Sequence, residues 1–165
     1  MDNYPPPLFQ KSSVIKLNDN DFLIRYNNVN DYLTIKLINP QFQGKHGYIM
    51  IYVDWCPHCR AKEDFWSYLA DQFNTKKSPY YKENFRIGVI HAEDPNSENI
   101  ISALDVGPVP KFMHVIPDEH GTNNLIDYQG SDLDPKTLMQ EVCDSSPTDA
   151  MCEFNADVLN PPPIQ

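Results

Sequence analysis

The sequence has no long apolar run. Its uninterrupted hydrophobic stretches are only a few residues long, whereas a membrane-spanning helix needs about 20. Residues 1–7 lack the basic and apolar segments of a secretion signal. No Asn-x-Ser/Thr sequon occurs in any of the 165 residues. We therefore expect a cytoplasmic protein that does not enter a membrane.

Basic residues are scarce in the second half of the chain. Residues 91–165 contain two basic side chains, Lys111 and Lys136, against 14 acidic ones. The whole chain has a net charge of −10. Nucleic-acid binding normally needs a basic face, because contacts to phosphates supply most of the affinity. This balance argues against nucleic acids and anionic membranes as partners, and we expect a monomer with a solvated acidic surface.

There are only four cysteines, and in a chain without a secretion signal they are not a disulfide framework by default. Their spacing is more informative than their number. Cys56 and Cys59 form a C-x-x-C pair, whereas Cys143 and Cys152 lie nine positions apart near the C-terminus. The second pair is compatible with a structural disulfide, two free thiols or a relay pair, and these interpretations stay open.

The chain divides into one domain between two tails. Residues 1–11 and 146–165 each contain three consecutive prolines, which favour extended polyproline conformations. The acidic C-terminal tail and the N-terminal tail are both expected to be dispensable for stability. The domain is predicted to span residues 12–145.

Hydrophobic periodicity predicts an α/β domain with a mixed sheet. Residues 32–37 alternate as a half-buried strand does, after turn-forming residues 27–31. Residues 48–53 are almost wholly apolar, as in a central strand covered on both faces. Residues 57–73 show a four-residue apolar period and predict an amphipathic helix. Further strands are predicted at 14–17, 85–90, 111–116 and 124–128, and further helices at 97–104 and 134–143.

The C-x-x-C pair has three possible uses: zinc binding, thiol–disulfide exchange, or none. A buried strand leads into Cys56 and a helix begins at Pro57. The free N–H groups and the dipole of a helix N-terminus stabilise a thiolate. A zinc site needs two more ligands, and Cys143 and Cys152 do not form a matching pair. The pattern therefore favours a redox site, with Cys59 better shielded than Cys56.

Three segments carry a resemblance to a known family. Residues 53–60 resemble the W-C-x-x-C-[KR] site of thioredoxins and protein disulfide isomerase domains. Residues 106–112 resemble the loop that carries the family's cis-proline, here Pro110, and residues 128–130 resemble its [YF]-x-G strand end. The resemblance implies a thioredoxin fold with an extra N-terminal strand segment, thiol–disulfide exchange, cell redox homeostasis and no bound cofactor. Small thioredoxin-like proteins of large DNA viruses are similar too.

The resemblance also implies roles for individual residues. Cys56 would be the nucleophile and Cys59 the resolving thiol, and the two would form the redox-active disulfide. Trp55, Pro57, Val109 and Pro110 would hold an extended substrate peptide, with the backbone of Val109 pairing with it. His58 would stabilise the Cys56 thiolate, although a solvent-facing turn residue is the alternative. Trp55 is expected to pack over the site.

Some positions depart from the family pattern. The buried acid six residues before the first cysteine is replaced by Met50, and Val89 or Ile90 stands near the usual lysine. That acid assists proton transfer at the resolving cysteine, so its absence argues against fast turnover. The Pro57-His58 dipeptide resembles that of the bacterial oxidant DsbA, so we expect a site more oxidising than thioredoxin.

Two functions remain in view. The first is a disulfide oxidoreductase acting on protein thiols and disulfides, with an unknown redox partner. The second is a non-catalytic thioredoxin-fold binding or structural module, for example a virion component. The four remaining histidines have no metal-ligand spacing and are expected to be structural or surface residues, namely His46, His91, His114 and His120.

Overall fold

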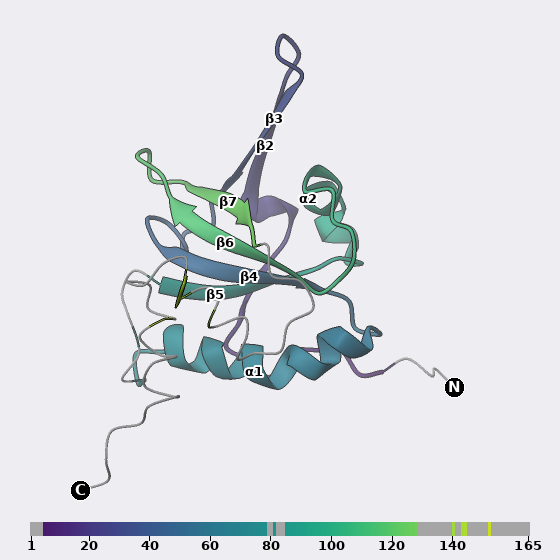
Figure 1. Cartoon of the computed structure of the whole chain (residues 1–165), viewed down its shortest axis with the longest axis vertical. Helices are drawn as coiled ribbons and strands as arrows, with labels where there is room; N and C mark the ends of the chain where they lie inside the picture. The colour runs from purple at the N-terminus through teal and green to yellow at the C-terminus, as the bar shows by residue number, and fades with distance from the viewer. Residues whose placement is uncertain are drawn as a thin grey trace, which may run out of the picture.

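The computed structural model describes residues 5–78, 81, 85–128, 140, 143–144 and 152. A seven-stranded sheet forms its centre, with strand order β1-β5-β4-β6-β7-β3-β2. Helix α1 lies along one face of the sheet, and the short helix α2 lies on the other side (Figure 1). The strands are β1 (Ile15–Leu17), β2 (Phe22–Asn27), β3 (Tyr32–Leu37), β4 (His46–Tyr52), β5 (Phe85–His91), β6 (Lys111–Pro117) and β7 (Asn123–Asp127). The helices are α1 (Pro57–Phe73) and α2 (Glu98–Ala103), with short 3-10 turns η1 (Asp19–Asp21) and η2 (Pro95–Ser97).

The central strand is β4, which confirms the mixed α/β sheet predicted from the sequence. It pairs in parallel with β5 and antiparallel with β6. Both faces of β4 are covered, so nearly all of its side chains are buried, and a continuous apolar run is the sequence that such a strand requires. β1 continues the parallel part beyond β5, and β7 continues the antiparallel part beyond β6. None of the helices in the described residues is long and apolar enough to cross a membrane.

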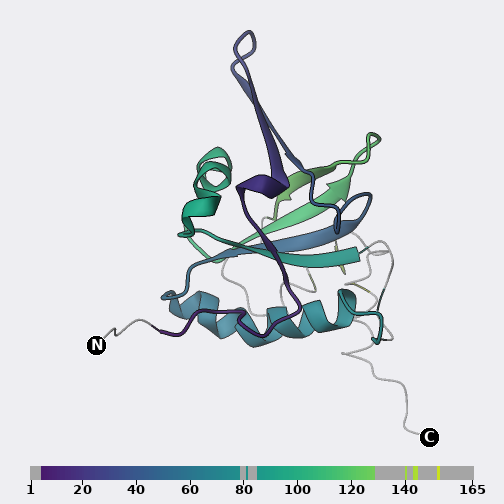
Figure 2. The ribbon, with the colours of Figure 1, turned by 180° about the vertical axis from the view of Figure 1, so that it is seen from behind.

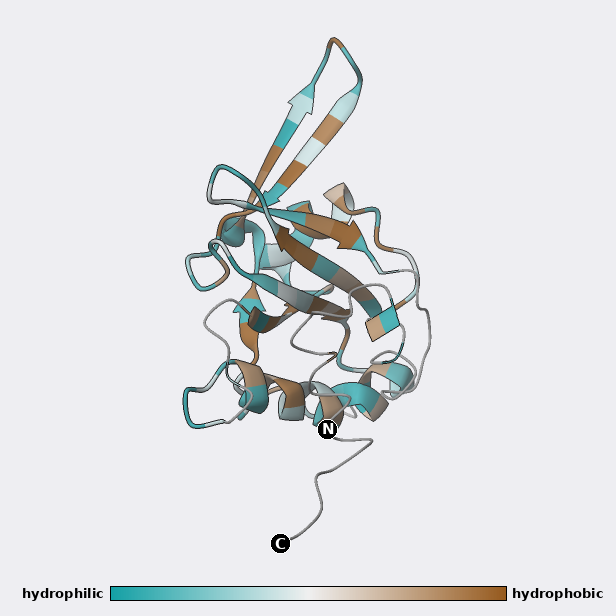
Figure 3. Ribbon diagram, turned by 60° about the vertical axis from the view of Figure 1, so that its left-hand side comes forward, coloured by the Kyte–Doolittle hydropathy of each residue, from teal (hydrophilic) through white to brown (hydrophobic). Residues whose placement is uncertain are grey.

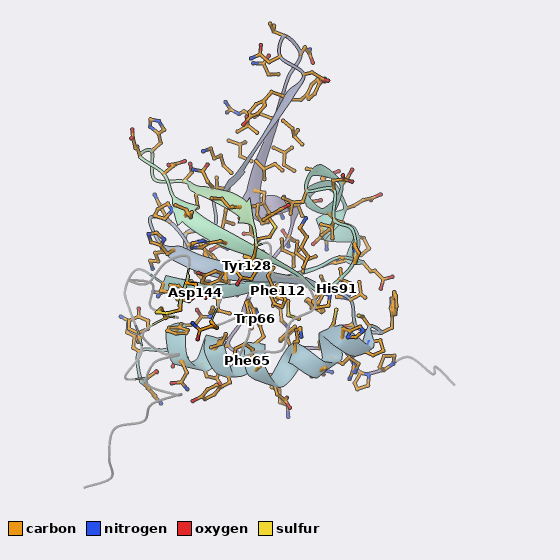
Figure 4. The ribbon with its side chains drawn as sticks, viewed as in Figure 1. Phe65, Trp66, His91, Phe112, Tyr128 and Asp144 are labelled. Carbon is orange, nitrogen blue, oxygen red and sulfur yellow. A yellow bond between two sulfur atoms is a disulfide. The ribbon has the colours of Figure 1, made fainter. Side chains whose placement is uncertain are left out.

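Helix α1 packs its apolar stripe against the sheet. Trp66 is fully buried, its ring centroid lies 5.2 Å from that of Phe112, and its indole N–H donates to the carbonyl of Gly88 at 3.0 Å. Figure 4 shows Trp66 and Phe112 in the space between helix and sheet. The contact fixes the axis of α1 relative to β5 and β6, and so fixes where the N-terminus of the helix lies.

The hairpin of β2 and β3 is only half predicted by the sequence. The alternation at 32–37 and the preceding turn are both present, but the partner strand β2 was not expected. Within the described residues β3 pairs with β7 only at Leu37 and Asn123, whereas it pairs with β2 at six positions. The hairpin therefore leaves the sheet and projects from the body of the domain (Figure 1).

The N-terminal segment differs from the extended tail expected from its prolines. Leu8 is 3% exposed and Phe9 is 1% exposed. Their backbone N–H groups donate to the carboxylates of Asp54 at 2.9 Å and Glu63 at 2.7 Å. We call residues 5–10 the N-terminal strap, and Figure 2 shows this part of the chain running beside α1. The side chains of Leu8 and Phe9 can be buried against the domain because the carboxylates of Asp54 and Glu63 accept the backbone N–H groups that are buried with them.

The predicted last helix and C-terminal tail lie largely outside the described residues. Gln140, Cys143 and Asp144 are helical, and the amide of Gln140 donates to Asp144 one turn later at 2.9 Å. The division of the chain at residue 146 stays a prediction.

Candidate redox site

Cys56 stands at the start of α1. β4 ends at Tyr52, and four residues later Cys56 has extended backbone angles (φ −79°, ψ 119°) and forms the N-cap of the helix, with Pro57 in its first turn. The N–H of Arg60 donates to the carbonyl of Cys56 at 3.0 Å. Cys56 is 6% exposed, Cys59 is fully buried, and both are free thiols. Cys56 is therefore the more accessible sulfur of the two.

The loop between α2 and β6 meets Cys56 from the opposite side. The Cys56 thiol donates to the carbonyl of Val109 at 3.7 Å, and the bond between Val109 and Pro110 is cis. Val109 and Pro110 are both partly exposed. The fold thus brings together residues that lie 53 positions apart in the sequence.

Three further predicted site residues face solvent beside Cys56. Pro57 and His58 are exposed in the first turn of α1, and Trp55 is 56% exposed. The indole N–H of Trp55 donates to a carboxylate oxygen of Glu93 at 2.6 Å. This hydrogen bond ties the Trp55 ring to the segment after β5. Glu93 was missed because nothing in its local sequence points to a partner 38 positions away.

Cys59 has a high proton affinity. Burial is the main cause, and with the neighbouring Cys56 it raises the pKa of the Cys59 thiol to about 12. A backbone hydrogen bond with Val53 and the charge of Lys62 lower the pKa, but by less than burial raises it. A thiolate formed at Cys59 therefore takes up a proton at neutral pH.

The surroundings of Cys59 explain this value. Met50 is fully buried and belongs to the same apolar cluster as Cys56 and Cys59. Lys62, one helical turn beyond Cys59, is only 8% exposed. The sequence predicted neither the burial of this lysine nor its effect on Cys59, although the three-residue spacing from Cys59 on a predicted helix was a usable signal.

Charged side chains tie the N-terminal strap to both sides of the C-x-x-C motif. The guanidinium of Arg60 donates to the carbonyls of Pro6 at 2.8 Å and Asp54 at 2.9 Å. In the Asp54 side chain, Oδ1 accepts from the N–H of Leu8, and Oδ2 lies 3.2 Å from Nε2 of His91. The adjacent Tyr52 has its pKa raised above the ordinary value, first by burial and then by nearby carboxylates. Figure 4 shows His91 at this end of the sheet.

The other cysteines and histidines lie outside this site. Cys143 and Cys152 form a disulfide with a Cα–Cα distance of 4.4 Å. His114 stacks on Tyr48 with ring centroids 4.6 Å apart, and burial lowers the pKa of His114 to about 4. Within the described part of the chain, no group of three His, Cys, Asp or Glu side chains could hold a metal ion.

Comparison with known proteins gives structural neighbours only. No family model and no curated protein matches the sequence. The structure of the Trx4 domain of ERdj5 is similar at 13% identity and a TM-score of 0.53, with 81% of this chain and 96% of that chain covered. Thioredoxin f2 of Chlamydomonas reinhardtii is similar at 14% identity and a TM-score of 0.51, with 82% and 99% covered. The parallel β1-β5-β4 strands, the antiparallel β6 and β7, and the helix that begins after Cys56 thus build a thioredoxin fold.

Proposed function

We propose that this protein is a thiol–disulfide oxidoreductase that exchanges disulfides with protein substrates. The observation that carries the proposal is the position of Cys56. Its sulfur lies at the N-terminus of a 17-residue helix and 3.7 Å from the Val109 carbonyl, with Cys59 buried one turn further on. A helix N-terminus favours the thiolate, which is the form that attacks or leaves in disulfide exchange.

The oxidising direction proceeds in two exchanges. A substrate thiolate attacks Cys56 of the Cys56–Cys59 disulfide, forms a mixed disulfide and releases Cys59 as a thiolate, which takes up a proton. A second substrate thiolate then attacks the substrate sulfur of the mixed disulfide and releases Cys56. Two substrate thiols become one disulfide, and the protein disulfide becomes two thiols. The high pKa of Cys59 favours its protonation once it has been released.

Reduction of a substrate disulfide requires Cys59 to act as a nucleophile. After Cys56 has attacked a substrate disulfide, Cys59 must lose its proton before it can resolve the mixed disulfide. With a pKa of about 12 and the fully buried Met50 in the same cluster, this step is slow at neutral pH. We propose separately that the protein is a stronger oxidant than thioredoxin, because His58 and the helix N-terminus stabilise the reduced form.

A substrate peptide has a surface to bind beside Cys56. Trp55 and Pro57 are exposed next to the sulfur, and Val109 and Pro110 are partly exposed opposite to it. We propose that an extended peptide lies between these pairs and pairs with the backbone of Val109. Its cysteine then faces Cys56.

The proposal is tested by separating the two cysteines. The full chain should accelerate the reduction of insulin by dithiothreitol, and Cys56→Ser should abolish the acceleration. Cys59→Ser should keep a nucleophile, lose turnover and accumulate a mixed disulfide with insulin that a mass spectrum identifies. Each variant is the control for the other, because the substitution is the same and only one removes the attacking sulfur.

Two results would contradict the proposal. If the wild-type chain gives no acceleration and Cys59→Ser traps no mixed disulfide with insulin, the protein is a non-catalytic module with a thioredoxin fold. If limiting iodoacetamide labels Cys59 before Cys56, the two roles are reversed.

A further inference from the structure

The hairpin of β2 and β3 exposes large hydrophobic side chains. Among the described residues, five of the nine large hydrophobic side chains classed as exposed lie on it: Leu23, Tyr26, Val29, Tyr32 and Leu33. Figure 3 shows hydrophobic residues along both strands as far as the hairpin turn. Contiguous exposed apolar surface on a soluble protein marks an interaction site more often than scattered single residues do.

β2 also has an unpaired backbone edge. It is the last strand of the sheet, and within the described part of the chain its only strand partner is β3. Soluble proteins protect such edges with proline, lysine or a bulge. β2 has no proline or lysine, and its six pairs with β3 follow one another without a bulge. Arg25 is the only charged residue of the strand.

The two faces of β2 differ in polarity. Phe22, Ile24 and Tyr26 point to one face, since side chains alternate along a strand. Exposure on that face rises from 6% at Phe22 to 58% at Tyr26 as the strand leaves the domain. The opposite face carries Leu23 and Arg25, followed by an asparagine. A strand added to this edge must therefore offer apolar side chains on the first face.

We propose that the strand added to β2 is β2 of a second copy of this chain. Two identical strands can pair antiparallel about a two-fold axis perpendicular to the sheet, which keeps each side chain on its own face. With the axis at Ile24, the two Ile24 side chains face each other and Phe22 faces Tyr26 of the second copy. Leu23 then faces Arg25 of the second copy. The apolar face becomes continuous across the dimer.

The charges favour the register centred on Ile24 over the one centred on Arg25. An axis at Arg25 would place the two guanidinium groups directly opposite, which is unfavourable. The hairpin, residues 22–37, contains Arg25, Lys36 and Asp31, a net charge of +1 in a chain of net charge −10. Because the hairpin projects from the domain, pairing through it brings the two acidic bodies less close together than contact between the bodies themselves would. This inference replaces the monomer expected at the outset.

The test uses opposite charges at Leu23, which is 37% exposed and so tolerates substitution. Sedimentation velocity of the full chain in reducing buffer should show a monomer–dimer equilibrium across a dilution series. Leu23→Arg places like charges opposite Arg25 twice per dimer and should weaken dimerisation about tenfold, while Leu23→Glu should strengthen it about tenfold. Added salt should strengthen the wild-type dimer, because it screens the net repulsion.

The matched controls are Ile126→Arg and Ile126→Glu. Ile126 is 50% exposed on β7, outside the hairpin, and these variants change the net charge by the same amounts. The two Ile126 variants should change the dimerisation constant little. They should not show the weakening by arginine and strengthening by glutamate that is expected at Leu23. A chain that sediments as a monomer at the highest concentration would overturn the inference, as would a dimer that responds equally at both positions. All four variants should retain insulin activity, so a loss of exchange chemistry is distinguished from a loss of dimerisation.

Discussion

At the scale of single residues, the two cysteines of one motif are given different chemistry by their neighbours. Cys56 retains 6% exposure at a helix N-terminus, and Cys59 is fully buried. Burial raises the pKa of Cys59 to about 12, and the charge of Lys62 offsets part of that rise. The proton on Cys59 therefore controls the rate of every step in which Cys59 attacks.

This predicts a strong pH dependence for resolution of the mixed disulfide. The thiolate fraction of Cys59 rises about tenfold per pH unit below its pKa. The rate at which a mixed disulfide on Cys56 decays should therefore increase with pH without a plateau near neutrality. Stopped-flow release of thionitrobenzoate from Cys56 measures it. Lys62→Met should slow the release at each pH, and Lys62→Arg, which keeps the charge, is the control. A plateau at neutral pH would mean that another group accepts the Cys59 proton.

At the scale of elements, the N-terminal strap behaves as part of the core. The ring of Phe9 packs edge-on against Tyr52 with centroids 5.0 Å apart, and its N–H is paired with Glu63. The strap contacts the loop before Cys56 through Asp54 and the helix after Cys59 through Arg60. Its docking therefore supports the site as well as the fold.

Removing the aromatic ring should destabilise the protein substantially. Phe9→Ala deletes a side chain that is 1% exposed, and such changes cost about 3 to 5 kcal/mol. The free energy of unfolding from urea titration measures the loss. Gln10→Ala, at the exposed neighbouring position, should change it by less than about 1 kcal/mol. If Phe9→Ala also lowers the free energy of unfolding by less than about 1 kcal/mol, the N-terminal segment is dispensable for stability, as its prolines suggested.

The elements also show where sequence reasoning stops. Helix α1 and strand β4 were predicted because their apolar patterns are long and regular. β2 was missed because Leu23 occupies the outward face and interrupts the alternation of Phe22, Ile24 and Tyr26. The strap was missed because two apolar residues have no period, and their carboxylate partners lie 46 and 54 positions away.

At the scale of the whole molecule, oxidation state and fold stability are linked. An oxidising protein is one whose reduced form is the more stable. Thioredoxin lies near −270 mV and DsbA near −120 mV, and we expect about −200 to −140 mV here. That range lies about 70 to 130 mV above thioredoxin, equivalent to about 3 to 6 kcal/mol.

Equilibration with glutathione should give a potential in this range, and the reduced chain should unfold at higher denaturant than the form oxidised at Cys56 and Cys59. His58→Gly should make the potential more negative, because it removes a group beside the Cys56 thiolate. His120→Gly, in the exposed turn between β6 and β7, is the control and should leave the potential unchanged. A potential near that of thioredoxin, with the oxidised form the more stable, would indicate a reductant instead.

The N-terminal strap has a consequence for the order of events during synthesis. Leu8 and Phe9 leave the ribosome before the carboxylates that accept their N–H groups, which belong to residues made 46 and 54 positions later. Until Asp54 and Glu63 have emerged and α1 has begun to pack, the N–H groups of Leu8 and Phe9 lack their hydrogen-bond acceptors. The N-terminal strap is thus bound only after the start of α1 has been made, and the point at which the strap becomes protected from a protease on the nascent chain would date the assembly of the site.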